Sequence, residues 1–371
     1  MIRPERGWLV PFTSLVPRED AADVRAAIER VVASGWFVLG PEVEAFEAEF
    51  AERSGARFAV GVASGTDAIA LTLRALGIGA GDEVITAPLS AAYSALAIMM
   101  TGARPVFCDI EGERMTIDPE QVESAISSHT RAIVPVHLYG QPAAMRELER
   151  IATRHHLAVV EDCCQAHLAT ESGRPVGTIG VAGAFSFYPT KNLGALGDGG
   201  AVVTNDPDLA TRLKRLRNGG QIDRYHHQDF GVNSRLDELQ AAVLRARLPR
   251  VGGWIARRRE LAARYRTALA GGGVHVPQEF DAGHVYHLFA VRSAARDELR
   301  QHLATHGIET LIHYPLPIPR QPALAATNPA DCSTASRVSA EVLSLPLHPG
   351  LGDDDIDRVA ATLKGHDACV H

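Results

Sequence analysis

Apolar and polar positions along the first two thirds of the chain predict helices that alternate with short buried strands. Arg18–Ser34 and Pro41–Ser54 repeat apolar residues with the helical period. Short apolar or β-branched runs bounded by Gly, Asp or Pro are typical of strands. These runs are Phe58–Val62, Glu83–Ala87, Pro105–Ile110, Ala132–Leu138 and Ala158–Glu161, and the helices expected between them are Asp67–Leu76, Ala91–Thr101, Pro119–Ile126 and Met145–His155.

Strands that are almost entirely apolar and alternate with helices indicate an α/β fold whose mainly parallel sheet is covered on both faces. The regularity changes after residue 184, where a strand at Ala201–Thr204 follows a Gly-rich turn, and Arg235–Leu269 reads as one long helix or two. Beyond Gly271 the pattern is α+β, with a strand at Val285–Val291 and helices over residues 296–306 and 353–363. We therefore predict an N-terminal arm (1–20), a large domain (21–250) and a smaller C-terminal domain (251–371).

The composition excludes several classes of protein. The 371 residues are 46% hydrophobic and 22% charged, as in ordinary globular proteins, and the net charge of −7 argues against a nucleic-acid binder. The N-terminus lacks a signal sequence and no apolar run is long enough for a membrane span, so we expect a cytoplasmic protein without a membrane partner. Five scattered cysteines and histidines without metal-ligand spacing predict neither a disulfide framework nor a metal site.

Lysine is scarce in this chain, and one lysine stands in an unusual context. Of the 37 Lys and Arg residues only three are lysines: Lys191, Lys214 and Lys364. Lys191 follows a strand-like segment and precedes the Gly-rich run 194–200. A solvated turn lysine is the ordinary interpretation, but only lysine can lose its proton when desolvated and attack a carbonyl to form a Schiff base. Lys191 is therefore a candidate covalent residue.

Two further features point to the same chemistry. The turn Ser64-Gly65-Thr66-Asp67 joins a predicted strand to a helix, where free N–H groups and the positive end of the helix suit a phosphate. Plain N-capping by Ser64 or Thr66 explains the turn equally well. Asp162 ends the strand that begins at Ala158, at the sheet edge where ligands gather, and its charge suits a protonated ring nitrogen. A lysine, a phosphate cradle and an acid are together what pyridoxal phosphate (PLP) binding requires.

At this point the residues resemble a known family over nearly the whole chain. The matching runs are FVLGPEVEAFE (37–47), VASGTDA (62–68), GDEVI (81–85), VHLYGQ (136–141), EDCCQAH (161–167), FSFYPTKNLGALGDGG (185–200), Arg217-Asn218, GVNSRLDELQAAVL (231–244) and HYP (313–315). The chain resembles the DegT/DnrJ/EryC1/StrS family of PLP-dependent nucleotide-sugar aminotransferases. This resemblance implies the fold-type-I transferase architecture, with a mainly parallel sheet of the seven-stranded type.

The resemblance also implies a role for individual residues. Lys191 would form the Schiff base and shuttle the proton, Asp162 would pair with the pyridine nitrogen, and Gln165 would lie near the phenolic oxygen of the cofactor. Tyr93 is the candidate for the aromatic ring stacked on the cofactor. The residues implied to hold the phosphate are Gly65, Thr66, Asp67 and Ser186, with Asn233 reaching it from a neighbouring subunit of a homodimer with shared active sites.

Within the family, a histidine in place of the lysine marks dehydratases, so Lys191 implies a transaminase with L-glutamate as amino donor. The run around Asp198 resembles members that aminate a 3-keto sugar, which favours a dTDP-linked 3-keto-6-deoxyhexose. A UDP-linked sugar, a 4-keto sugar, a cyclitol ketone and a catalytically idle PLP-binding or regulatory protein stay open as alternatives. The candidates for substrate binding, each of which also fits a plain surface role, are Arg217, Arg224, Tyr225 and His313.

Overall fold

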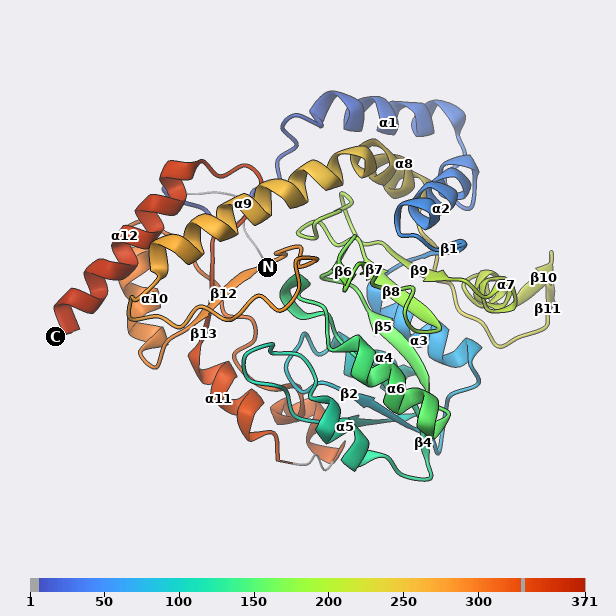
Figure 1. Cartoon of the computed structure of the whole chain (residues 1–371). Helices are drawn as coiled ribbons and strands as arrows, with labels where there is room; N and C mark the ends of the chain where they lie inside the picture. Colours follow the sequence, from blue (N-terminus) through green and yellow to red (C-terminus); the bar gives the residue numbers. More distant parts are fainter. Residues whose placement is uncertain (1–6, 328–330, 371) are drawn as a thin grey trace.

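A seven-stranded sheet forms the centre of the protein (Figure 1). The computed structural model describes residues 7–327 and 331–370. The sheet order is β1-β9-β8-β5-β4-β2-β3, and β9 alone runs antiparallel to its neighbours, so the expected mainly parallel sheet is confirmed. The strands are β1 (Phe58–Val62), β2 (Glu83–Thr86), β3 (Arg104–Phe107), β4 (Thr130–Val134), β5 (Ala158–Asp162), β8 (Ala182–Ser186) and β9 (Gly200–Thr204).

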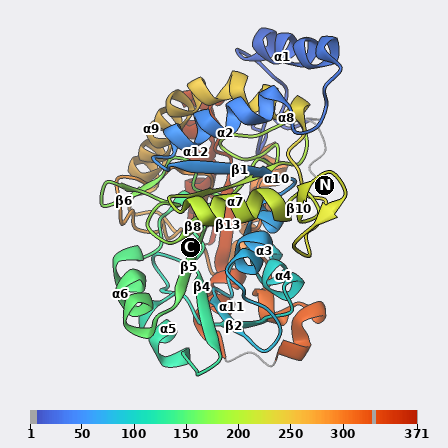
Figure 2. The same ribbon diagram turned by 90° about the vertical axis from the view of Figure 1, so that its right-hand side faces the viewer.

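Helices cover both faces of this sheet, which explains why its strands are apolar on both sides (Figure 2). One face packs against α3 (Gly65–Ala75), α4 (Tyr93–Met100) and α7 (Pro207–Leu216). The opposite face packs against a second set of helices, α2 (Pro41–Arg53), α5 (Pro119–Ala125), α6 (Met145–His155) and α8 (Glu238–Arg247). Helix α1 (Ala21–Ser34) lies on α8 at the outside of the molecule.

The segment Arg235–Leu269, which the sequence predicted as one long helix or two, forms two helices. Helix α8 passes through the short 3₁₀ turn η2 (Leu248–Arg250) into α9 (Val251–Leu269). Pro249 stands near the start of this turn, where its missing N–H costs nothing. The predicted domain boundary falls at the start of α9, and the division into domains stays a prediction.

The C-terminal part has its own small sheet and core. Strand β12 (Phe289–Arg292) pairs antiparallel with β13 (Val342–Leu345), and α10 (Arg296–Thr305) and α12 (Asp353–Val370) pack beside them. The predicted strand Val285–Val291 was wrong at its start, because β12 begins only at Phe289. Before it, the backbone N–H groups of Val285 and Leu288 donate to the carbonyls of Gly140 and Tyr139, and not to a neighbouring strand. Helix α11 (Ser333–Glu341) and β13 were not predicted from the sequence.

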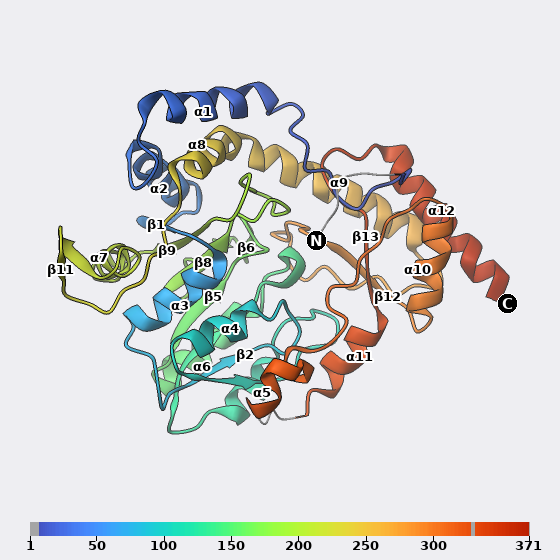
Figure 3. The same ribbon diagram turned by 180° about the vertical axis from the view of Figure 1, so that it is seen from behind.

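The described residues also form two small hairpins, β6–β7 (Thr170–Glu171, Arg174–Pro175) and β10–β11 (Gln221–Asp223, His226–His227). The second hairpin projects from the end of α7, away from the body of the molecule (Figure 3). Within the described residues, no helix combines the length and apolar character needed to cross a membrane.

Candidate active site

The candidate site lies where β5, β8 and the start of α3 meet. Parallel strands β5 and β8 end side by side, with Asp162 opposite Ala184 and Ser186 two residues further along. Gly65, the first residue of α3, faces both strand ends: a Cβ at this position would lie 2.6 Å from Sγ of Cys164 and 2.8 Å from Cβ of Ser186. Glycine is therefore the residue that this close approach permits.

The carboxylate of Asp162 is buried and fixed by two hydrogen bonds. Oδ2 accepts a 2.7 Å bond from the hydroxyl of Ser94 in α4, and Oδ1 accepts a 3.1 Å bond from the backbone N–H of Cys164. Because a carboxylate oxygen can accept more than one hydrogen bond, a donor arriving from the cofactor side can still bind. The acid is thus held in one orientation at the end of its strand.

Asp162 and Cys164 are electrostatic neighbours of Lys191. The backbone N–H of Lys191 donates to the carbonyl of Tyr188 at 2.8 Å, which closes a tight turn after β8. Desolvation lowers the pKa of Lys191 below its ordinary value, and the charge of the nearby Asp162 opposes this shift. Burial raises the pKa of Cys164 well above its ordinary value, so this neighbour is a neutral thiol. A desolvated lysine beside a fixed acid is an amine prepared for nucleophilic attack.

The phosphate turn is a capped helix start. The hydroxyl of Ser64 accepts a 3.1 Å bond from the N–H of Asp67, which agrees with N-capping by Ser64. The carboxylate of Asp67 accepts a 2.7 Å bond from the hydroxyl of Ser234. The first N–H groups of a helix have no partner within the helix, so those of Gly65 and Thr66 remain suited to an anion.

Gln165 is held at both ends of its amide. Its Oε1 accepts a 2.7 Å bond from the N–H of Tyr139, and its Nε2 donates a 3.0 Å bond to the hydroxyl of Tyr314. Tyr314 belongs to the HYP run, and its electrostatic neighbours are Asp162 and Cys164. The fold therefore adds Tyr314 to the wall of the site.

Of the residues predicted to bind the substrate, His313 lies at the site and Arg217 does not. His313 lies at the site: its Nδ1 is 2.9 Å from the hydroxyl of Ser344, and burial together with the charge of Lys191 lowers its pKa to about 4. Arg217 lies in the interior, where it pairs with Glu47 and donates to the carbonyl of Gly61 at 2.7 Å. This placement argues against Arg217 at the mouth of a cleft, because its guanidinium is occupied by the protein itself.

Four other predicted residues are exposed in a single copy of the chain. Arg224 and Tyr225 lie between β10 and β11, on the hairpin that projects from the body of the molecule (Figure 3), and the Arg224 guanidinium is 5.1 Å from the centre of the Tyr225 ring. Asn233 is exposed and bridges to Asn218. Tyr93, the first residue of α4, is 63% exposed and directly precedes Ser94. In one chain the side chains of Arg224, Tyr225 and Asn233 therefore face solvent.

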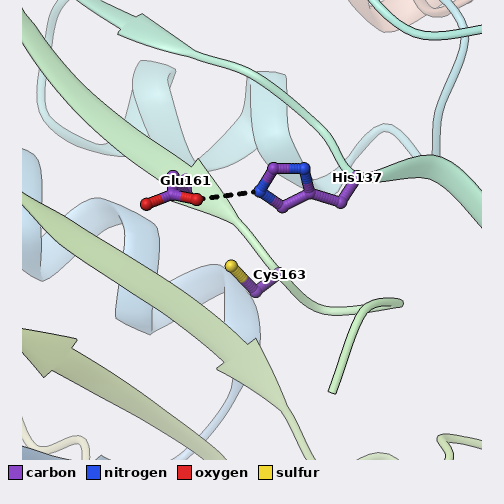
Figure 4. Close-up of side chains that lie close together, drawn as sticks. All are labelled: His137, Glu161 and Cys163. Carbon is purple, nitrogen blue, oxygen red and sulfur yellow. Dashed lines mark hydrogen bonds and ion pairs between the residues drawn. The ribbon is translucent and has the colours of Figure 1, made fainter. Parts of the chain in front are cut away.

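Next to the site, the fold brings together His137, Glu161 and Cys163, a set that the sequence spacing did not indicate (Figure 4). The N–H of Ala143 donates to Nδ1 of His137, so the ring hydrogen lies on Nε2, which donates to Glu161 at 3.1 Å. A metal ligand needs a free nitrogen lone pair, and a thiolate rather than a thiol. The pKa of Cys163 is raised well above its ordinary value by burial and by the nearby carboxylates.

The Glu161 carboxylate is itself saturated by the protein. It accepts backbone N–H bonds from Gly177, Ile179 and Gly180 at 2.7 to 2.8 Å, besides the bond from His137. Because the hydrogen-bonding groups of His137 and Glu161 are paired within the protein, we interpret this cluster as structural. Its hydrogen bonds act as a clamp that holds loop 177–180 and the segment after β4 against β5, directly beside Asp162.

The residues of the pocket fit PLP. Gly65 lets the start of α3 approach the strand ends closely, and the free N–H groups there suit a phosphate. The oriented carboxylate of Asp162 suits a protonated ring nitrogen, and the desolvated amine of Lys191 suits an aldehyde. Sequence reasoning missed Ser94, Cys164, Tyr139 and Tyr314. The signals were present, since Ser94 follows Tyr93 and the other three lie in the runs VHLYGQ, EDCCQAH and HYP.

Comparison with known proteins gives matches over nearly the whole chain. A profile of the DegT/DnrJ/EryC1/StrS aminotransferase family matches residues 18–364. The dTDP-3-amino-3,4,6-trideoxy-alpha-D-glucose transaminase of Streptomyces venezuelae is 51% identical over 361 residues, which cover 96% of this chain and 95% of that protein. The structure of S. venezuelae DesV superposes with a TM-score of 0.93 at 49% identity, covering 96% of this chain and 98% of that chain. NtdA of Bacillus subtilis with bound cofactor PMP gives a TM-score of 0.89 at 31% identity, covering 97% and 85% of the two chains.

Proposed function

Because the chain belongs to the DegT/DnrJ/EryC1/StrS aminotransferase family, we propose that it transfers an amino group from L-glutamate to a dTDP-linked 3-keto-6-deoxyhexose. The family and its cofactor, pyridoxal 5′-phosphate, are those that the sequence predicted. The observation that carries the proposal is the desolvated amine of Lys191 beside an acid held by Ser94. The named activity of the S. venezuelae relative supports the sugar class.

Each residue of the site has a role in this proposal. PLP, when bound, supplies an electron sink at the reacting carbon. Lys191 would hold the cofactor and, as a positioned base, would move a proton between C4′ of the cofactor and the reacting carbon of the bound substrate. Asp162, oriented by Ser94, keeps the ring nitrogen protonated, and the turn at Gly65 and Thr66 anchors the phosphate with the help of Ser186.

The exposed candidates support a shared site between two copies. Arg224, Tyr225 and Asn233 present polar groups to solvent, and the hairpin that holds the first two projects away from the body of the molecule (Figure 3). We propose a homodimer in which these residues reach the partner's site, where a cation and an aromatic ring suit a nucleoside diphosphate.

A catalytically idle PLP-binding protein is the second candidate, and UDP-linked sugars, 4-keto sugars and cyclitol ketones are the alternative substrates. An idle protein needs the lysine and the phosphate turn but has no need for an oriented acid. The hydrogen bond from Ser94 to Asp162 therefore favours the enzyme.

The test is a spectrum followed by a substrate screen. Purified protein with PLP is expected to show the visible band of a lysine-bound cofactor, and L-glutamate is expected to convert it to the shorter-wavelength pyridoxamine form. The band should be absent from Lys191→Ala. A band that no amino donor alters would support the idle protein. Nucleotide-linked keto-sugars are then screened, and NMR of the product gives the aminated carbon.

A further inference from the structure

A cavity borders Lys191 on the side of the N-terminal segment. Its volume is about 760 Å³ including its opening to solvent, and its walls come from residues 13–20, the Lys191 turn, α8, α9 and residues 348–350. Thr190, Lys191 and Asn192 form one wall, and Arg258 of α9 lines the cavity together with them. A ligand in this cavity would therefore lie next to Lys191.

Arg258 differs from the other buried arginines. Three arginines among the described residues are buried, and Arg217 and Arg247 pair with Glu47 and Asp20. Arg258 is 6% exposed and has no carboxylate within ion-pair distance in the described part of the chain. Its Nη1 donates to backbone carbonyls, the nearest being that of Leu347 at 2.8 Å, and its Nε is buried without a hydrogen-bond partner.

The acids of the cavity do not neutralise this guanidinium. Asp20 accepts a 2.7 Å bond from Nε of Arg247, and Glu19 accepts a 2.7 Å bond from the indole of Trp254. Desolvation alone lowers the pKa of Arg258 to about 10, so it remains a cation at neutral pH. A buried cation without an anion is costly, and a negatively charged ligand would offset that cost.

We propose that Arg258 binds a carboxylate of the amino donor, which makes this cavity the donor subsite. The inference rests on the proposed function, since L-glutamate is the reactant that carries carboxylates. The α-carboxylate is attached to the carbon whose amine must reach the cofactor at Lys191, and the γ-carboxylate lies at the far end of the same small molecule. A planar guanidinium pairs well with either carboxylate.

The test separates the two half-reactions of the PLP-loaded enzyme. Conversion of the visible band by L-glutamate reports on the donor, and its return with the keto-sugar reports on the acceptor. Arg258→Gln is expected to raise the glutamate concentration for half-maximal rate by about 10- to 100-fold, within the range for a bond to a charged group. The sugar half-reaction should stay within about twofold. Arg259→Gln is the matched control, because Arg259 also donates to a carbonyl, at 2.8 Å on His284, but does not line the cavity.

A second variant leaves the carbonyl contacts of Arg258 in place. Thr13→Asp introduces a negative charge into the cavity wall, and Thr13→Asn is its neutral counterpart. Thr13→Asp should weaken the binding of glutamate, and Thr13→Asn should leave it unchanged. Calorimetry with glutarate, a dicarboxylate without an amine, gives a readout that needs no turnover. Glutarate should bind the wild type and Arg259→Gln equally, and Arg258→Gln at least about tenfold more weakly.

The outcomes are distinct. L-2-aminobutyrate carries only the α-carboxylate. If Arg258→Gln slows conversion by this donor as much as conversion by glutamate, Arg258 binds the α-carboxylate. If only conversion by glutamate slows, Arg258 binds the γ-carboxylate. An unchanged glutamate half-reaction in Arg258→Gln, or a larger loss with the nucleotide-sugar than with glutamate, overturns the donor subsite. A wild-type enzyme that no amino acid converts contradicts the proposed function instead.

Discussion

The hydroxyl of Ser94 lies 2.7 Å from Oδ2 of Asp162 and donates a hydrogen bond to it. This contact joins the first turn of α4 to the end of β5, across 68 residues of sequence. The orientation of the acid therefore depends on α4, whose first residue, Tyr93, is an electrostatic neighbour of Tyr314 in the wall of the site. Changes at the start of α4 should therefore affect the cofactor through Asp162.

Replacement of Ser94 by alanine is the direct test of this contact. Ser94→Ala should raise the dissociation constant for PLP by about tenfold, because a hydrogen bond to a charged group contributes on the order of 1.5–3 kcal/mol. Absorbance titration of the unloaded protein with PLP measures the effect. Thr86→Val is the control, since Thr86 is also buried but donates to the carbonyl of Val134 at 2.9 Å. Equal affinities of Ser94→Ala and wild type would contradict the role.

The capture of PLP by Lys191 should depend on pH with a midpoint below that of a free lysine side chain. Desolvation lowers the pKa of Lys191, so the neutral and nucleophilic amine forms at a lower pH than in a solvated lysine. The rate should rise with pH, then level off once the amine is deprotonated. Stopped-flow absorbance follows the capture, with Nα-acetyl-lysine as the reference. A midpoint equal to that of the reference would show that the amine is fully solvated.

A methyl group at Gly65 should disturb the phosphate turn. Gly65→Ala places a Cβ 2.6 Å from Sγ of Cys164 and 2.8 Å from Cβ of Ser186, so the helix start or the strand ends must move. We expect PLP affinity to fall by at least about tenfold, a shift of roughly 1.4 kcal/mol. Gly253→Ala is the matched control, because it lies in α9 with no atom within 4 Å of the added Cβ. Helix propensity makes that change neutral or slightly stabilising.

Glu161 should stabilise the protein rather than hold a metal. Glu161→Gln replaces an accepting oxygen with an N–H₂ group that faces backbone N–H donors, so the free energy of unfolding should fall by about 1–3 kcal/mol. Urea denaturation measures the change, and the exposed Glu298→Gln serves as control. An unchanged unfolding midpoint would show that the clamp contributes nothing.

Removal of metal ions should not affect the activity. His137 uses Nδ1 to accept from Ala143 and Nε2 to donate to Glu161, which leaves no nitrogen for a metal. Dialysis of the PLP-loaded enzyme against EDTA should therefore leave the conversion by glutamate unchanged. A loss of activity that Zn²⁺ restores would contradict this interpretation of the cluster.

Local patterns in the sequence were sufficient to predict the sheet and the candidate site residues at its edge. Apolar strands between amphipathic helices follow from burial on both faces, and the sheet confirms them. Lys191, Asp162 and the turn at Gly65 each adjoin a strand, and ends of neighbouring strands meet at one edge. Short-range periodicity and turn chemistry thus placed the covalent, acidic and phosphate-binding candidates together.

Contacts between distant segments were decided only by the tertiary structure. Arg217 looked like a substrate residue until packing brought Glu47, 170 residues away, against its guanidinium. Ser94 reached Asp162 and Arg258 came to line a cavity with Lys191 for the same reason. Whether a polar side chain faces a ligand, solvent or a buried partner depends on which surfaces the helices cover, and no spacing along the chain records that choice.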